Sequence, residues 1–239
     1  MPTPEALSFL ARLARNNSRA WFQENRSEYE TVLLEPLRDL VDEMDARLAL
    51  MAPEFVGDRR RSVFRIHRDV RFSRDKRPYK TNAALWLFHR DAGRTKGFHD
   101  SVAAAGFYYH LEPGACYIGG GLWMPPAPSL RLIRSAMVAD AADEGRFGSI
   151  LRGRAFRRAA GALDMDPGTM LTRLPRGFGP DTPGAEWLRY KSFTATVPLS
   201  DDQATAADLA DRFAENCRVL LPLARWLNSA LGYPPASRR

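Results

Sequence analysis

The sequence has few cysteines and no long hydrophobic run. Among 239 residues only Cys116 and Cys217 are cysteines, and two lone thiols do not make a disulfide framework. No apolar stretch approaches the roughly 18 residues that span a bilayer, and residues 1–5 lack the basic and apolar regions of a signal peptide. We therefore expect a cytoplasmic protein with no membrane partner.

The sequence also lacks the common signatures of catalytic and metal sites. It contains no Gly-x-x-x-x-Gly-Lys-Ser/Thr phosphate loop, no Gly-x-Ser-x-Gly elbow and no His-Glu-x-x-His pair. No Cys or His pair has the spacing of zinc ligands, and positive charge surrounds the acidic candidates Asp69 and Asp75. We predict neither a metal nor a cofactor.

Composition and periodicity indicate an α+β fold. Hydrophobic residues make up 45% and charged residues 26%, as in ordinary globular domains. Helical periodicity fills both ends of the chain, and strand-like segments gather in the middle and near the C-terminal helices, at residues 62–72, 83–89, 106–123 and 193–199. The predicted fold is a central, mainly antiparallel sheet with N-terminal and C-terminal helices packed on it. We expect a single domain over residues 1–239, with an ordered core at about residues 5–232.

Residues 106–123 form the clearest predicted hairpin. Pro113 and Gly114 are the ideal central residues of a type II turn. One face of the hairpin is then apolar, and the other carries Tyr108, His110, Glu112 and, opposite His110, Tyr117. A histidine beside a carboxylate could perform general acid/base chemistry, so His110 and Glu112 are catalytic candidates. The alternative is a sheet face on which His110 is merely hydrogen-bonded.

The positive charge of the protein is concentrated in residues 59–80. This segment holds ten basic residues and only two acidic ones, Asp69 and Asp75, so its charge of +8 exceeds the net charge of +7 of the whole chain. Arginine forks bind phosphates and carboxylates through paired hydrogen bonds, and lysine adds a point charge. On a strand and the loop after it, such residues could converge on one anion.

The segment therefore predicts a site for a small anionic, phosphorylated ligand, in a binding domain or an enzyme. Tyr79 would shape the pocket, and the charge would be bound by five basic residues, Arg65, Arg68, Arg71, Lys76 and Lys80. His67 is a third catalytic candidate, because the arginines around it favour its neutral form. The alternative is that His67 is one more surface residue.

Two other functions stay open. Nucleic acid is a natural partner for arginines interleaved with aromatic residues, here Phe64, Phe72 and Tyr79, although Phe64 and Phe72 fall on the predicted core side of the strand. In the other hypothesis, Asp69 and Asp75 pair with the arginines, and the segment serves structure or partner binding. The sequence carries no signal for the reaction or the oligomeric state.

The basic segment also resembles a known family. Residues 64–81, Phe-Arg-Ile-His-Arg-Asp-Val-Arg-Phe-Ser-Arg-Asp-Lys-Arg-Pro-Tyr-Lys-Thr, are similar to the signature of domain of unknown function 2461. Shorter landmarks agree, at Asn16-Asn17, Trp21-Phe22, Glu112-Pro113-Gly114, residues 119–123, Ile133-Arg134 and Lys191-Ser192-Phe193. The resemblance covers about residues 5–232 and implies one domain of conserved hypothetical type. It implies no activity, so no catalytic residue follows from it.

Overall fold

The computed structural model describes residues 1–92, 104–165, 168, 170–233 and 235–236. The N-terminal helical part comprises α1 (Pro4–Arg15), α2 (Arg19–Glu24), α3 (Arg26–Glu28), the π-helical segment η1 (Tyr29–Leu34) and α4 (Glu35–Met51). The strands are β1 (Phe55–Val56), β2 (Ala83–His89), β3 (Gly106–Leu111), β4 (Cys116–Leu122) and β5 (Phe193–Leu199). The other helices are α5 (Ala127–Ala142), α6 (Arg146–Arg152), α7 (Arg154–Ala159), α8 (Ala185–Leu188), α9 (Asp201–Ala204) and α10 (Leu209–Ala230).

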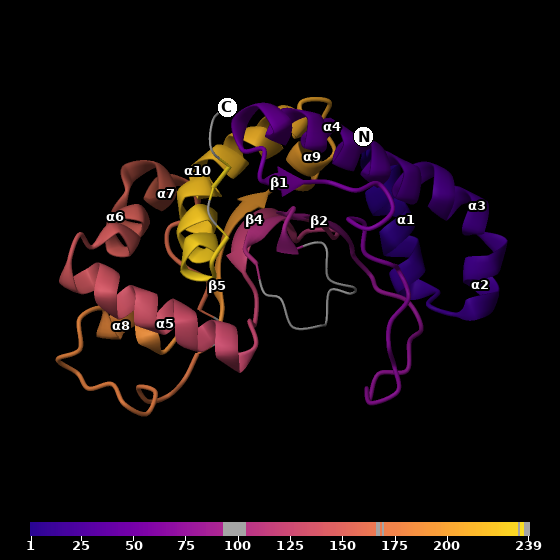
Figure 1. Cartoon of the computed structure of the whole chain (residues 1–239). Coiled ribbons are helices and arrows are strands. Elements are labelled where there is room, and N and C mark those ends of the chain that lie inside the picture. Colours follow the sequence, from indigo (N-terminus) through magenta and orange to yellow (C-terminus); the bar gives the residue numbers. More distant parts are fainter. Residues whose placement is uncertain (93–103, 166–167, 169, 234, 237–239) are drawn as a thin grey trace.

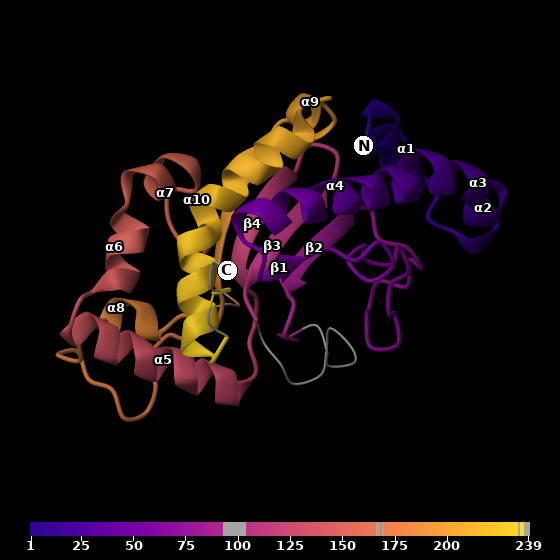
Figure 2. The same cartoon turned by 45° about the horizontal axis from the view of Figure 1, so that its top comes forward.

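The strands that the structure describes form one sheet in the order β1-β2-β3-β4-β5, and all neighbours in it are antiparallel. Helix α4 packs on β1 and β2, and α10 packs on β3 and β4. Figure 2 shows both helices crossing the same side of the sheet. An N-terminal and a C-terminal helix therefore cover an antiparallel sheet, which confirms the predicted α+β fold.

Strand alternation puts apolar side chains on the face that these helices cover. On β3, Phe107, Tyr109 and Leu111 are fully buried, and the Tyr109 hydroxyl donates to the carbonyl of Ala204 at 2.6 Å. Burial of each large apolar side chain stabilises the fold by about 1.5–3 kcal/mol. Because successive strand residues point to opposite faces, the residues between them on β3 lie on the other side of the sheet.

The predicted hairpin is confirmed in its register. Strands β3 and β4 pair so that His110 lies opposite Tyr117. Gly114 has a φ of 75°, as the second central residue of a type II turn requires, and the amide of Ala115 donates to the carbonyl of Glu112 at 2.9 Å. This turn fixes which side chains of the two strands share a face.

The starts of two helices follow local sequence signals. A capping box between Ser200 and Gln203 begins α9, and α10 follows as a separate helix. Helix α5 begins at Ala127, with a proline in its first turn, where the missing N–H costs little. No described helix combines the length and the apolar character needed to cross a bilayer.

The strand predicted at residues 62–72 forms only in part. Isolated bridges join Val63 to Leu85 and His67 to Tyr79, so the chain follows β2 briefly and then turns away. Phe72, which the alternation placed on the core side, is 95% exposed. That prediction is wrong, because strand parity predicts burial only where the segment stays on the sheet.

A buried amide joins α10 to the residue before β3. The side chain of Asn228 is 1% exposed and pairs with the backbone of Ala105: Oδ1 accepts from the amide at 2.7 Å, and Nδ2 donates to the carbonyl at 3.1 Å. Ala105 is itself fully buried. The asparagine thus supplies both hydrogen bonds that a neighbouring strand would otherwise provide.

Replacing Asn228 with alanine leaves two buried backbone groups unpaired. We expect Asn228→Ala to lower the free energy of unfolding by about 2–4 kcal/mol, since each unsatisfied buried group costs about 1–3 kcal/mol. Urea unfolding measures the difference. Asn216→Ala is the matched control on α10, because the Asn216 amide donates to the Arg212 carbonyl one turn earlier. Equal losses in the two variants would contradict this role for Asn228.

Candidate functional site

The basic segment begins with a residue that belongs to the scaffold. Arg59 follows β1 and donates to three carboxylates of α4: Glu35 at 2.7 Å, Asp39 at 2.9 Å, and Asp42. These hydrogen bonds raise the pKa of its guanidinium above the ordinary value, and the one to Asp39 contributes most. The first arginine therefore fixes the chain to α4 and is not available to a ligand.

The next residues extend the edge of the sheet. Phe64 donates its amide to the carbonyl of Ala84 at 3.0 Å, and the amide of Trp86 donates to the carbonyl of Ser62 at 2.9 Å. These bonds lie beside the first half of β2, whereas β1 pairs with its last residues. The segment is thus held in line with the sheet before the charged residues begin to leave it.

A hairpin then extends from this edge of the sheet. The amide of Lys80 donates to the carbonyl of Ile66 at 2.8 Å, and the amide of Arg68 donates to that of Pro78 at 2.9 Å. We call residues 66–80 the basic hairpin. Figure 1 shows it reaching away from the sheet, on the side opposite α4 and α10.

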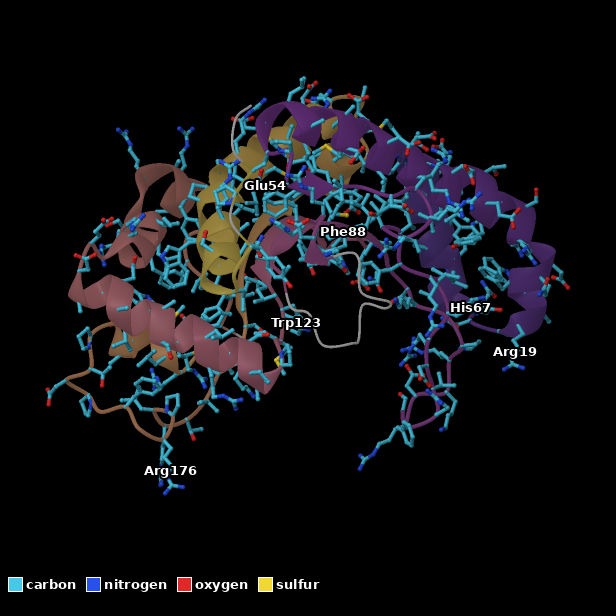
Figure 3. The ribbon with its side chains drawn as sticks, viewed as in Figure 1. Arg19, Glu54, His67, Phe88, Trp123 and Arg176 are labelled. Atoms are coloured by element: carbon cyan, nitrogen blue, oxygen red, sulfur yellow. The ribbon has the colours of Figure 1, made fainter. Side chains whose placement is uncertain are left out.

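The basic hairpin is anchored at Tyr79. The side chain of Asn17 accepts from the Tyr79 amide at 3.0 Å and donates to its carbonyl at 3.0 Å. The Tyr79 ring is 3% exposed and stacks on Phe22 with centroids 4.2 Å apart. Tyr79 therefore faces the N-terminal helices. His67 lies opposite it, exposed at the base of the hairpin (Figure 3), with its ring centroid 5.1 Å from that of Tyr79.

Two aspartates hold arginines in the same manner within the hairpin. Asp69 accepts from Nε of Arg71 at 3.0 Å, from its Nη2 at 2.7 Å and from its amide at 3.2 Å. Asp75 accepts from Nε of Arg77 at 3.1 Å, from its Nη2 at 2.7 Å and from its amide at 3.0 Å. Asp75 also accepts from Nη1 of Arg68 at 2.6 Å.

These bonds keep both aspartates ionised. Hydrogen bonds from Arg71 lower the pKa of Asp69 to about 2, and those from Arg77 and Arg68 lower the pKa of Asp75 well below its ordinary value. The ion pairs are exposed to solvent, with Arg71 at 77% and Arg77 at 55%. Exposed pairs contribute about 0–1 kcal/mol each, so their main consequence is the orientation of the guanidinium groups.

The sheet face opposite α4 and α10 carries a hydrogen-bonded network around His110. We call it the polar face and define it by Tyr108, His110, Glu112 and Tyr117. His110 is 9% exposed; its Nε2 lies 3.1 Å from Oε2 of Glu112, and its Nδ1 lies 3.1 Å from the Tyr108 hydroxyl and 3.3 Å from Nδ2 of Asn82. The imidazole also stacks on Tyr117, with centroids 4.6 Å apart.

The partners of His110 define where its proton lies. A carboxylate can only accept and an amide nitrogen can only donate, so Nε2 donates to Glu112, and Nδ1 is the acceptor beside Asn82. Both nitrogens of the imidazole are therefore used within the protein. Burial raises the pKa of Tyr108 well above its ordinary value, so the phenol keeps its proton. His110 holds its neighbours in position.

Lys80 connects the basic hairpin with the polar face. Its ammonium lies 5.3 Å from the centroid of Phe64, whose ring meets Tyr108 edge-on at 5.9 Å. The next residue, Thr81, donates its hydroxyl to Oε1 of Glu112 at 3.2 Å. Lys80 is half-buried and pairs with no carboxylate in the described part of the chain. Burial lowers the pKa of Lys80, and the charge of Arg65 lowers it further.

The structure brings some of the predicted site residues together and separates others. Lys80 lies within electrostatic range of Arg65, and the residue after it, Thr81, joins the network of His110 and Glu112. The other predicted cationic contacts lie farther out on the basic hairpin; they are Arg68, Arg71 and Lys76, whose ammonium donates to the carbonyl of Val70 at 3.0 Å.

Sequence reasoning missed the two asparagines of this region. Asn82 lies directly before β2, and its side chain reaches His110 on the neighbouring strand β3. Its place between a basic segment and a strand was the available signal. Asn17 reaches Tyr79 across 62 residues of sequence, and no local pattern marks such a contact.

The polar face is not the only candidate location for a functional site. A cavity of about 920 Å³ lies between α5, α6, α7 and α10. Its Asp140 is already used, because the carboxylate accepts from the Phe147 amide at 2.8 Å and from Nε1 of Trp226 at 3.2 Å. Among the described residues, no cluster of three His, Cys, Asp or Glu could hold a metal ion. We therefore place the candidate site where the basic hairpin meets the polar face.

The Asn17 side chain should control the order of the basic hairpin. We expect Asn17→Ala to speed hydrogen exchange of the Tyr79 and Lys80 amides about tenfold or more, because it removes both hydrogen bonds that anchor the backbone there. The neighbouring Asn16→Ala is the control, since the Asn16 amide donates to the carbonyl of Arg12 within α1 at 2.9 Å. Unchanged exchange in Asn17→Ala would show that the anchor lies elsewhere.

One family model matches this chain. It is described as a conserved hypothetical protein family, DUF2461, and the match covers residues 5–226. No curated protein and no solved structure gives a match. The matched residues include both Asn17 and the whole basic hairpin, as well as the polar face. The chain belongs to the DUF2461 family of conserved hypothetical proteins.

Proposed function

We propose that the protein binds a small phosphorylated anion where the basic hairpin meets the polar face, with Lys80 and Arg65 as its cationic contacts. The setting of Lys80 carries this proposal. Its ammonium is half-buried beside Phe64 and lacks a carboxylate partner among the described residues. A partly desolvated cation without a counter-ion is costly, and a bound anion would offset that cost.

The electrostatics around Lys80 support an anion of high charge. Burial and the nearby charge of Arg65 both disfavour the protonated form of Lys80. A phosphate group carries up to two negative charges near neutral pH and three strong acceptor oxygens. It can neutralise both cations at once, which a singly charged carboxylate cannot do.

Neutral groups at the same junction could complete the site. The Asn82 amide directs one N–H toward His110 and has a second to offer. Acid/base chemistry by His110 or Glu112 would first require the hydrogen bond between them to be exchanged. Binding is therefore the core of the proposal, and an enzymatic reaction is an extension of it. The cytoplasm, which supplies phosphorylated metabolites, is the location that we propose.

Removal of the Lys80 charge should weaken binding of a phosphate monoester. With phenyl phosphate as the probe, we expect Lys80→Met and Arg65→Met each to lower affinity about tenfold or more, since a hydrogen bond to a charged group contributes about 1.5–3 kcal/mol. Isothermal titration calorimetry measures the change. Arg60→Met is the control, because Arg60 is an exposed arginine of the same segment, in the turn after β1.

Two results would argue against this proposal. Wild-type affinity in Lys80→Met would show that the lysine does not contact the anion. A loss of stability in Lys80→Met, with no binding of phenyl phosphate to the wild-type protein, would favour a purely structural role for the segment.

The pH dependence of binding gives a second test. A bound anion stabilises the ammonium, so affinity should fall as the pH rises through the lowered pKa of Lys80 in the free protein. The charge of the ligand stays constant there, because its second pKa is about 6. Lys80→Arg keeps its charge at these pH values, so its affinity should stay constant over the same pH range. Equal declines in the two proteins would contradict the assignment.

A further inference from the structure

The outer end of the basic hairpin exposes an aromatic ring among cations. We call residues 69–77 the hairpin tip. It stands clear of the helices in two views (Figures 1 and 2). Phe72 lies in it with 95% of its surface exposed. The basic residues of the tip are all exposed as well; they are Arg71, Arg74, Lys76 and Arg77.

The aspartates of the hairpin tip orient its arginines without blocking them. Asp69 and Asp75 each occupy the edge of a guanidinium formed by Nε and Nη2. The Nη1 nitrogens of Arg71 and Arg77 have no partner among the described residues, so each can still donate two hydrogen bonds. Arg74 makes no ion pair within the described part of the chain. The tip retains a net charge of +2 from four basic and two acidic residues.

We propose that the hairpin tip binds single-stranded nucleic acid. A base would stack on Phe72, and the phosphates on either side would contact Arg71, Arg74, Lys76 and Arg77. Proteins that bind single strands combine cations along the backbone with aromatic rings under the bases, and guanidinium groups match phosphate geometry. This surface uses none of the residues that hold the small anion at the polar face, so the two proposals stand independently.

The contact between Arg71 and Phe72 favours a nucleic acid over an anionic membrane. The guanidinium carbon lies 5.9 Å from the centroid of the ring. Insertion of Phe72 into a bilayer would draw this cation toward the hydrocarbon, which is costly. A stacked base leaves the guanidinium beside the phosphates, where the charge is stabilised. A duplex offers less, because its bases are already stacked on one another.

Fluorescence anisotropy with a labelled oligothymidylate of about 12 nucleotides, within the range of single-strand site sizes, tests the proposal. We expect Phe72→Ala to weaken binding about 5- to 100-fold, because this is roughly the effect of losing one base–aromatic stack. Arg74→Gln should weaken binding and lower the slope of log affinity against log salt by roughly 0.7, as the loss of one phosphate contact predicts.

Two matched variants control for the general effect of removing an exposed apolar or basic side chain. Leu50→Ala removes another exposed apolar side chain, 91% exposed on α4, and Arg176→Gln removes an exposed arginine on a loop away from the hairpin (Figure 3). Both should bind the oligonucleotide within about twofold of the wild-type protein. Phe72→Ala should also bind phenyl phosphate like the wild-type protein, which separates this test from that of the polar face.

Three outcomes would overturn the proposal. Wild-type oligonucleotide affinity in Phe72→Ala would exclude stacking at the tip. An equal loss on a duplex of the same length would mean that Phe72 does not read an unstacked base. The third outcome concerns vesicles of phosphatidylserine and phosphatidylcholine. If these vesicles bind the wild-type protein but not Phe72→Ala, while Phe72→Ala still binds the oligonucleotide normally, the tip would be assigned to a membrane surface.

Discussion

The position of the basic hairpin depends on the pair of hydrogen bonds between the Asn17 side chain and the backbone of Tyr79. A charged hairpin has little apolar surface of its own, and a lone two-stranded hairpin is marginally stable in water. Asn17 supplies the polar half of an anchor, and the Phe22 ring over Tyr79 supplies the apolar half. The residues shortly after Tyr79 contact the His110 network, since Thr81 donates to Glu112 and Asn82 lies beside His110. The same anchor therefore sets the position of Lys80.

The ion-pair and ligand-binding hypotheses for the basic segment are compatible. Arg59 is a scaffold residue, since three carboxylates of α4 surround it. Asp69 and Asp75 hold Arg71 and Arg77 through one edge of each guanidinium, which orders these side chains and leaves their Nη1 nitrogens without a partner among the described residues. An arginine ordered in advance loses less conformational freedom when it meets an anion. Internal aspartates in a basic segment are thus not evidence against a binding role.

The sequence predicted those features that local chemistry decides. Pro113 and Gly114 specify the turn that places His110 opposite Tyr117, and the apolar run of β2 specifies a buried strand. Phe72 was misplaced because its parity was counted along a strand that ends before Arg68. The anchors at Asn17 and Asn228 could not be predicted, since each joins a side chain to a backbone 62 or 123 residues away, and a polar amide near a helix end has many possible partners.

The cations at the two ends of the basic hairpin differ in their exposure to solvent. This difference determines which kind of anion each end is suited to bind. At its base, Lys80 is half-buried and its pKa is lowered, so one compact anion can gain strongly from a single desolvated contact. At its tip the cations are exposed to solvent, and each contact with an anion is weak and screened by salt. Useful affinity there requires several phosphates at once and an apolar contribution that salt does not screen, which Phe72 provides. A polymer of phosphates with aromatic bases meets both requirements, and a small anion meets neither.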